Sequence, residues 1–188
     1  MKVEVKEENE RSISFVLTDA TDSEANAIRR ACVSFVKVFA IDSVTVYENS
    51  SVMFDEYIAH RVGLVPIATP TKGYGDDDQI LFTLEAEGPK TVYSSELKSS
   101  DKEVKVANGA IPLIKLAAGQ RLRLEGKAVL GTAARHAKFQ PGIVTYGKEG
   151  DGFKFYVETF GQMTHRQMIN NGLDAIGRGL KAVSKQLK

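Results

Sequence analysis

"THRQMINNGLDAIGRGLKAVSKQLK", residues 164–188, constrains the architecture of this chain more than any other segment. Apolar residues recur along it at intervals of four and three, a period of 3.5 that is typical of a helix packed lengthwise against another helix. Thr164 with Gln167 three residues later forms a capping box that marks the start of the helix. The apolar positions are Ile169, Leu173, Ile176, Leu180, Val183 and Leu187.

Three glycines lie inside this predicted helix, where each costs up to about 1 kcal/mol relative to alanine. We interpret Gly172, Gly177 and Gly179 as places where another element approaches closely. Two arrangements remain open: the helix docks on a sheet of its own chain, or it shares its apolar seam with a partner chain. We favour the partner, because two long helices at opposite ends of the sequence leave more apolar surface than one small sheet can cover. The opposite face is basic, with Arg178, Lys181, Lys185 and Lys188.

The other long helix is predicted near the start of the chain, at about residues 22–36. Thr21 and Glu24 form a second capping box before it. Arg29 and Arg30 are expected to be exposed near its middle. Its apolar face follows helical spacing and carries Ile28, Cys32, Phe35, Val36 and Phe39.

Most of the remaining sequence reads as short strands, which indicates an α+β fold. "KVEVK" and "SISFVLT" alternate with period two and predict a hairpin. A shorter helix is predicted within residues 50–66, with Ser51 as a possible cap and Gly63 in a left-handed position at its end. Residues 136–152 are expected to be irregular.

Composition excludes several classes of protein. With 25 basic and 24 acidic residues, the net charge of +1 argues against direct binding of duplex DNA. One cysteine, Cys32, excludes an internal disulfide and a cysteine metal cage. No signal peptide or apolar stretch of membrane-spanning length is evident, so we expect a cytoplasmic protein without membrane contact.

"DEYIAHR", residues 55–61, is the window that most resembles an active site. Glu56 and His60 are one helical turn apart, but a zinc protease motif would need a second histidine where Glu56 stands. Cys32 falls on an apolar helix face, and the acidic "YGDD" (74–77) lies in a loop that we expect to be solvated. The sequence therefore predicts no catalytic residue and no metal site in this chain.

Three segments together resemble one known family: "NAIRR" (26–30), "YENSSVMFDEYIAHRVGLVPI" (47–67) and "FYVETFGQM" (155–163). This is the family of archaeal DNA-directed RNA polymerase D subunits, the α-like subunits related to the bacterial α N-terminal domain and to the third-largest eukaryotic polymerase subunit. "TVYSSELKS" (91–99) and "HAKFQP" (136–141) fit the same pattern. The resemblance extends over essentially the whole chain in order.

The resemblance implies a discontinuous dimerisation domain, a sheet with two long helices, built from residues 1–47 and 148–188. A mostly-β domain, residues 48–147, is inserted into it and contacts the large subunit. The chain would be a non-catalytic platform that pairs with the smaller α-like subunit L and nucleates assembly of the large catalytic subunits, together with small subunits N and P. DNA and Mg²⁺ would then be bound only by the assembled enzyme, a nucleotidyltransferase.

The same resemblance implies two sets of contact residues. The pairing interface would comprise Ile28, Cys32, Phe35, Ile169, Leu173, Ile176, Leu180 and Val183. Contact with the β-like large subunit would involve Arg29, Arg30, Glu56, His60, Arg61, Leu64 and Pro66. For "DEYIAHR", a solvated helix face with one internal ion pair remains the alternative.

One departure from the family concerns iron. Many archaeal D subunits carry a cysteine-rich insertion with iron–sulfur clusters, and a cluster needs about four cysteines. This sequence has one cysteine and passes from "FQPG" to its last predicted strand without such an insertion, so we expect no cluster.

Two rival functions remain. The first is a homodimer of the bacterial α type, although bacterial α normally adds a linker and a DNA-binding domain. The second is a free-standing enzyme that uses Glu56, His60 and Arg61.

Overall fold

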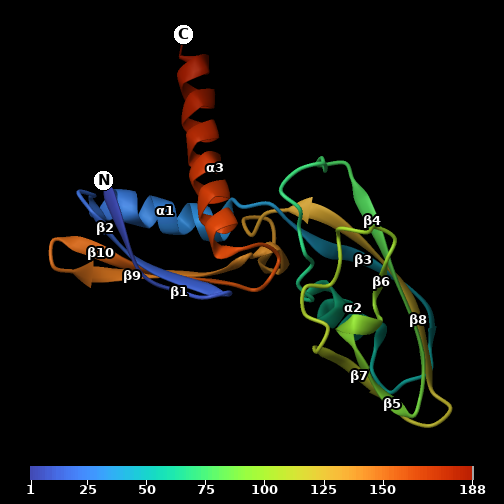
Figure 1. Cartoon of the computed structure of the whole chain (residues 1–188). Coiled ribbons are helices and arrows are strands. Elements are labelled where there is room, and N and C mark those ends of the chain that lie inside the picture. The colour runs from blue at the N-terminus through green and yellow to red at the C-terminus, as the bar shows by residue number, and fades with distance from the viewer. Residues whose placement is uncertain (188) are drawn as a thin grey trace. The chain divides into compact units, whose positions relative to one another are not determined.

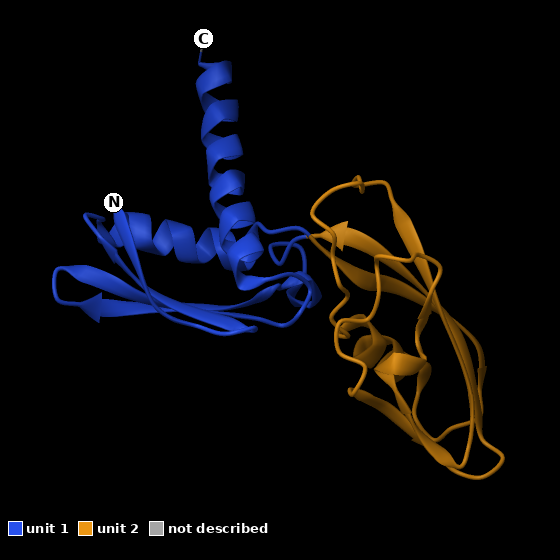
Figure 2. Ribbon diagram, in the orientation of Figure 1, with its two compact units in different colours: residues 1–37, 132–188 blue, residues 38–131 orange. Residues whose placement is uncertain are grey.

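The computed structural model describes residues 1–187, so the predicted basic-face residue Lys188 lies outside the described residues. The chain has an α+β fold, with three α-helices and several antiparallel sheets among these residues. It divides into two compact units, one made of residues 1–37 with 132–188 and the other of residues 38–131 (Figure 2). None of the helices described is long and apolar enough to span a bilayer.

The boundaries of these units differ from the predicted domain boundaries. Breaks after residues 47 and 147 would fall inside strands β3 (Val38–Asn49) and β9 (Gly142–Glu149). Strand β3 pairs with β8 (Arg121–Gly131) along nearly its whole length. Dividing that ladder would leave backbone groups unpaired, so all of β3 belongs with β8 in the second unit.

The first unit is a four-stranded antiparallel sheet with two helices (Figure 1). The strands follow the order β1-β2-β10-β9. Helix α1 lies over one face of the sheet, and helix α3 crosses α1 and then extends away from the unit. The bounds are β1 (Lys2–Glu8), β2 (Ser12–Thr18), β10 (Gly152–Thr159), α1 (Asp22–Ser34), α3 (His165–Gln186) and the short 3-10 helix η2 (Ala137–Phe139).

Aromatic pairs across the strands hold this sheet together. Phe15 and Phe155 are direct partners in the β2–β10 ladder, and their rings stack with centroids 5.0 Å apart. The ring of Tyr146, from β9, stacks on Phe155 at 5.2 Å. Such cross-strand aromatic pairs stabilise antiparallel sheets. The predicted β1–β2 hairpin is confirmed, with Val5 opposite Phe15.

The expectation that residues 136–152 are irregular is wrong over β9. This strand pairs with β10 along its whole length: Gly142 lies opposite Thr159 at one end, and Glu149 lies opposite Gly152 at the other. Its alternation of buried and exposed residues is clear only in the first half; beyond the half-buried Tyr146, residues 147–149 are all exposed. The period-two signal is therefore weak in the sequence, and pairing with β10 decides the strand.

The second unit contains a four-stranded sheet of order β3-β8-β4-β6 and a two-stranded sheet, β5-β7. Helix α2 (Asp55–Gly63) packs against β3 and β7 and buries Ile58 and Val62. Side chains from both sheets and α2 form one hydrophobic core. The further bounds are β4 (Gln79–Glu87), β5 (Lys90–Tyr93), β6 (Lys98–Ser99), β7 (Pro112–Leu116) and the 3-10 helix η1 (Ser94–Glu96).

Both capping boxes are confirmed, at Thr21 before α1 and at Thr164 before α3. The predicted ends of α2 are wrong. Its N-cap is Phe54, whose side chain makes no capping bond, while the Ser51 hydroxyl donates to Asn49 Oδ1 at 2.6 Å. Gly63 is still helical and the C-cap is Leu64 with φ -85° and ψ -4°, so no left-handed glycine ends this helix.

Candidate interaction surfaces

The first half of α3 is anchored to its own unit. Met168 and Gly172 are fully or nearly fully buried, and the predicted seam residues Ile169 and Ile176 are half-buried. The backbone before the helix is also fixed, because the Thr159 hydroxyl donates to the carbonyl oxygen of Met163 at 2.7 Å. These contacts hold the base of the helix against α1 and the sheet.

The second half of α3 is exposed on every side. Residues 178–187 are all exposed, so both the apolar seam and the basic face are open to solvent here. Leu180 is 67% exposed and Leu187 is 83% exposed, while Val183 is 56% exposed. Leu173, at the base, is also exposed. Of the two arrangements considered for this helix, docking on its own sheet accounts for only its first half.

The crossing of α1 and α3 depends on one glycine. A Cβ atom at Gly172 would lie 2.9 Å from the backbone N and Cα of Cys32 and from its Sγ. Gly172 therefore allows a helix approach that no other residue permits, as its position in the helix suggested. Cβ atoms at Gly177 and Gly179 would meet nothing within 4 Å, so the described residues do not explain these two glycines.

Cys32 belongs to this crossing and not to a reactive site. Its side chain is buried, and burial raises the pKa of the thiol to about 11. A thiol with a raised pKa is a poor nucleophile at neutral pH. Among the other α1 positions predicted to pair with a partner, Ile28 is half-buried, and Phe35 lies just beyond the helix end with its ring exposed.

The two arginines of "NAIRR" differ in their environment. Arg29 is half-buried, and its guanidinium donates to Asn26 Oδ1 at 3.0 and 3.2 Å. Arg30 is exposed. Arg30 is therefore better placed than Arg29 to meet another chain, because Arg30 is exposed whereas Arg29 is half-buried and bonded to Asn26.

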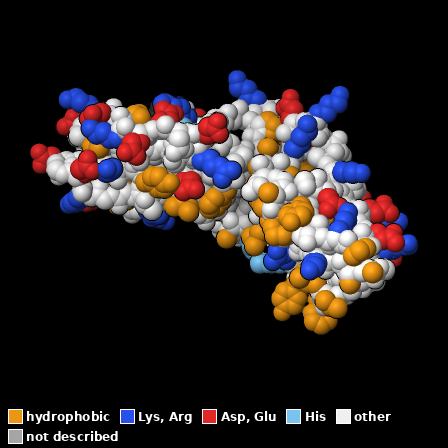
Figure 3. All heavy atoms as spheres, turned by 60° about the horizontal axis from the view of Figure 1, so that its bottom comes forward, with side chains coloured by type: hydrophobic (Ala, Val, Ile, Leu, Met, Phe, Trp, Pro, Cys, Tyr) orange, Lys and Arg blue, Asp and Glu red, His pale blue; other side chains and the backbone are white. Residues whose placement is uncertain are grey.

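A second surface lies at the start of α2, in the other unit. An open groove of about 440 Å³ is lined by Val52, Met53, Phe54, Tyr57, His60 and Arg61. Val52 is 92% exposed and Phe54 is 71% exposed, and the ring of Phe54 stacks on that of Tyr57. Figure 3 shows hydrophobic side chains protruding beside a histidine on this unit. Exposed apolar side chains that cluster in this way mark protein-binding surfaces.

The predicted recognition residues of α2 play unequal parts in this surface. Arg61 donates to the carbonyl oxygens of Leu113, at 2.7 Å, and Pro112, at 2.5 Å, and so ties α2 to β7. Glu56 and His60 are exposed, and within residues 1–187 no hydrogen bond or ion pair joins them. Leu64 is exposed, whereas Pro66 is half-buried.

Two exposed apolar residues of the groove, Val52 and Phe54, are not singled out by the sequence, and Tyr57 is noted only as a member of the charged window "DEYIAHR". Val52, Met53 and Phe54 are three consecutive apolar residues, too few to show a helical or strand period, and the charged "DEYIAHR" that follows them is the more conspicuous signal. Only the fold reveals that these side chains point outward together. A stretch of apolar residues with no period, next to a short helix, is the one hint that the sequence contains.

No cluster of three or more His, Cys, Asp or Glu side chains that could hold a metal occurs among residues 1–187. In the acidic loop, Asp78 accepts a hydrogen bond from the Gly75 amide at 2.7 Å, as expected for a turn. The expectation that this chain holds no cofactor stays a prediction.

Comparisons with known proteins point in one direction. A model of the RNA polymerase Rpb3/RpoA insert domain matches residues 40–144. The DNA-directed RNA polymerase subunit Rpo3 of Methanocaldococcus jannaschii is 44% identical over 167 residues, covering 88% of this chain and 85% of the relative. Rpo3 of Pyrococcus furiosus is 47% identical over 152 residues, covering 78% of this chain. The chain spans only 58% of the length of the Pyrococcus relative.

Proposed function

The chain belongs to the archaeal DNA-directed RNA polymerase subunit Rpo3 family, the D subunits, and from this premise we propose that it is a non-catalytic assembly platform of the polymerase. It acts in the cytoplasm, and it meets DNA only through the assembled enzyme. Other chains catalyse nucleotidyl transfer and bind its Mg²⁺. This chain carries no iron–sulfur cluster. The first unit, residues 1–37 with 132–188, serves as its dimerisation domain, and the second unit contacts the large subunit.

The first proposed partner is the smaller α-like subunit L. The observation that carries this assignment is the exposed apolar seam on the second half of α3, at Leu180, Val183 and Leu187. An apolar stripe of period 3.5 is the surface that a second helix covers. Ile28 and Phe35 of α1, with Ile169, Leu173 and Ile176 of α3, extend the interface toward the base of the helix. Cys32 supports it from within the crossing.

The second proposed partner is the β-like large subunit, which binds the groove at the start of α2. Phe54, Tyr57 and Val52 supply the apolar contact, while Glu56 and His60 fix register by complementary charge. Leu64 contributes from an exposed position at the end of α2, and the exposed Arg30 is a separate proposed contact on the first unit. Arg61 is exposed and contributes chiefly by holding α2 on β7, while Pro66 is half-buried. The half-buried Arg29 would contribute from the first unit. Small subunits N and P join the same assembly.

A pull-down of subunit L tests the first pairing. Leu180→Asp places a charge in the seam and should abolish recovery of subunit L with this chain. Lys181→Asp is the matched control, since it introduces the same side chain one residue further along the exposed part of the helix. Equal recovery of subunit L by wild-type chain and by Leu180→Asp would overturn the assignment of the seam.

A capture experiment with the large subunit tests the second surface. Phe54→Asp and Arg30→Glu should each weaken recovery of the large subunit while leaving the pair with subunit L intact. Arg178→Glu, on the exposed basic face of α3, controls for the loss of a positive charge. Unchanged recovery with both variants would remove α1 and α2 from this interface. A stable symmetric dimer of the chain alone would instead favour the bacterial α arrangement.

A further inference from the structure

Within residues 1–187, helix α3 is buried only near its base, although its proposed binding seam extends to its far end. At 1.5 Å per residue, the segment from residue 166 to residue 187 is about 30 Å long. A rotation of about 10° at the base would move the far end by about 5 Å, close to one helical turn. The direction in which the base points therefore decides where the seam is presented.

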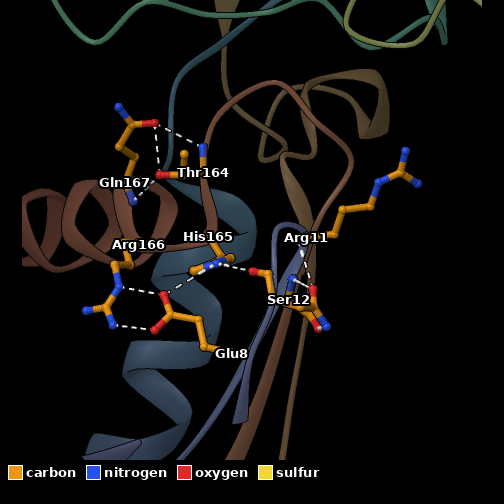
Figure 4. Close-up of polar contacts among 8 residues, drawn as sticks. Glu8, Arg11, Ser12, Thr164, His165, Arg166 and Gln167 are labelled. Carbon is orange, nitrogen blue, oxygen red and sulfur yellow. Dashed lines mark hydrogen bonds and ion pairs between the residues drawn. The ribbon is translucent and has the colours of Figure 1, made fainter.

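Two polar contacts join this base to the turn between β1 and β2, which is more than 150 residues distant in sequence. Arg166 donates to both carboxylate oxygens of Glu8, from Nε at 2.6 Å and from Nη2 at 2.5 Å. The buried ring of His165 bonds through Nε2 to the carbonyl oxygen of Asn9 at 2.9 Å. Figure 4 shows both side chains reaching from the first turn of α3 to this hairpin.

The hairpin turn is itself a firm support. The Asn9 side chain accepts the backbone amides of Arg11, at 2.9 Å, and Ser12, at 2.8 Å, and donates to the Ser12 hydroxyl. The Asn9 amide also donates to the Ser12 carbonyl oxygen. Because four hydrogen bonds close the turn, its backbone should resist deformation when the direction of α3 changes.

Stability alone does not explain the ion pair. The side chains of Glu8 and Arg166 are 34% and 59% exposed, and ion pairs at such positions contribute little to folding free energy. A bidentate arginine–carboxylate pair also fixes the relative orientation of the two side chains, because its two parallel hydrogen bonds must form in one plane. The hydrogen bond from Arg166 also holds the pKa of Glu8 below its ordinary value of 4.5, so the pair is charged at neutral pH.

We propose that Glu8, Arg166 and His165 are positioning residues for partner binding, which fix the direction of α3 through the β1–β2 turn so that its seam meets the partner helix in register. They act through α3 and need not touch the partner. This inference rests on the proposed pairing with subunit L. It adds that the affinity depends on a contact far in sequence from the seam.

The first measurement is the direction of α3 in the full chain without its partner. Spin labels at Lys154→Cys on β10 and Lys181→Cys on α3 report the distance between the sheet and the helix. Cys32 is buried with a raised pKa and should remain unlabelled. Glu8→Gln and Arg166→Lys should each broaden the distribution of distances between the two labels. Lysine keeps the positive charge of Arg166 but cannot form the bidentate pair of hydrogen bonds with Glu8. Helix content should not change.

The second measurement is the affinity of the same variants for subunit L. Both should bind at least about tenfold more weakly, since part of the binding free energy is then used to order α3. The double variant Glu8→Arg with Arg166→Glu should recover both the narrow distribution and the affinity. Glu10→Gln, an exposed neighbour in the same turn, is the matched control and should behave as wild type.

The outcomes separate this inference from the proposed function. If Leu180→Asp abolishes pairing but Glu8→Gln and Arg166→Lys bind as wild type, the pairing stands and the positioning role is wrong. If no variant affects pairing, the proposed function itself fails. Weaker binding with an unchanged distance distribution would show direct contact with the partner and would also overturn the positioning role.

Discussion

Helices α2 and α3 differ in how much of their surface their own unit covers. Helix α2 is nine residues long and is fastened by buried Ile58 and Val62 and by the bonds from Arg61 to β7. Helix α3 has 22 residues, and only its base, with buried Met168 and Gly172, is packed. Its own unit thus covers one face of α2, whereas the second half of α3 remains exposed. The position of α2 is therefore explained by contacts within this chain, whereas the exposed apolar surface of α3 is not.

The difference indicates two ways of presenting a binding surface. In the second unit the apolar groove lies at the start of a short helix, and the hydrophobic core of that unit fixes the position of this helix. In the first unit the apolar seam lies on a long helix, and a few contacts at one end fix its position. Substitutions at the base of α3 should therefore affect both stability and binding, whereas those on its outer half should affect binding alone.

The largest effect is expected at the crossing of α1 and α3. Gly172→Ala places a methyl group 2.9 Å from backbone atoms of Cys32, which cannot move without shifting α1. Overpacking of this kind typically costs about 1–3 kcal/mol, and we expect the upper end here. Urea denaturation followed by circular dichroism measures the loss.

Gly179→Ala is the matched control for that variant. A Cβ atom at Gly179 meets nothing within 4 Å, and alanine raises helix propensity by up to about 1 kcal/mol. The chain alone should therefore be unchanged or slightly stabilised. Equal destabilisation by the two variants would contradict the distinction between the base and the outer half of α3.

A smaller effect is expected when α2 is loosened. Arg61→Leu removes the donors to the carbonyl oxygens of Leu113 and Pro112 and should cost about 1.5 kcal/mol. The loss should appear in the denaturation of the second unit, with weaker capture of the large subunit as a consequence. Wild-type stability with lost capture would instead make Arg61 a direct contact residue.

Removing the cap of α3 should destabilise the chain, whereas α2 has no side-chain cap to lose. The Thr164 hydroxyl accepts the Gln167 amide at 3.2 Å, and Thr164→Ala should cost about 1 kcal/mol. Helix α2 has no side-chain cap at Phe54, so Phe54→Ala should leave stability nearly unchanged. Thermal denaturation of the two variants, monitored side by side, tests this contrast.

The smallest effect concerns pH. The hydrogen bond from Arg166 lowers the pKa of Glu8 below its ordinary value of 4.5 in the folded chain. Protonation then favours the unfolded chain, so the contribution of Glu8 is complete above pH 4.5 and is lost as the pH falls through the folded-state pKa. In Glu8→Gln, denaturation midpoints between pH 6 and pH 3 should fall less steeply than in wild type. Parallel curves would remove Glu8 from the acid response.

Much of α1 and α3 could be predicted because their signals are local. A capping box spans four residues, and the 3.5-residue period repeats along α3, so neither needs knowledge of the rest of the chain. Strand β9 and the ends of α2 were mispredicted for the opposite reason. The exposed residues 147–149 of β9 form a strand by pairing with β10, and α2 has neither the serine cap nor the left-handed glycine that its sequence suggests.

The functional surfaces divide in the same way. The seam was readable because it repeats, and "DEYIAHR" was conspicuous because it is charged. Val52 and Phe54 of the groove were missed, since exposure of an apolar side chain is a property of the folded surface and leaves no period in the sequence. The link from Arg166 to Glu8 was also missed, because nothing local connects residues so distant along the chain.

The family, the α+β class and the apolar period of the last helix follow from the amino-acid sequence, because each depends on neighbouring residues or on segments that resemble known relatives. The tertiary structure alone decided that half of α3 is left uncovered, that Gly172 is the residue which admits α1, and that Arg61 supports α2 from within its own unit. These depend on which distant segments come into contact, and the free energy of such contacts is set by burial and geometry that exist only once the chain has folded.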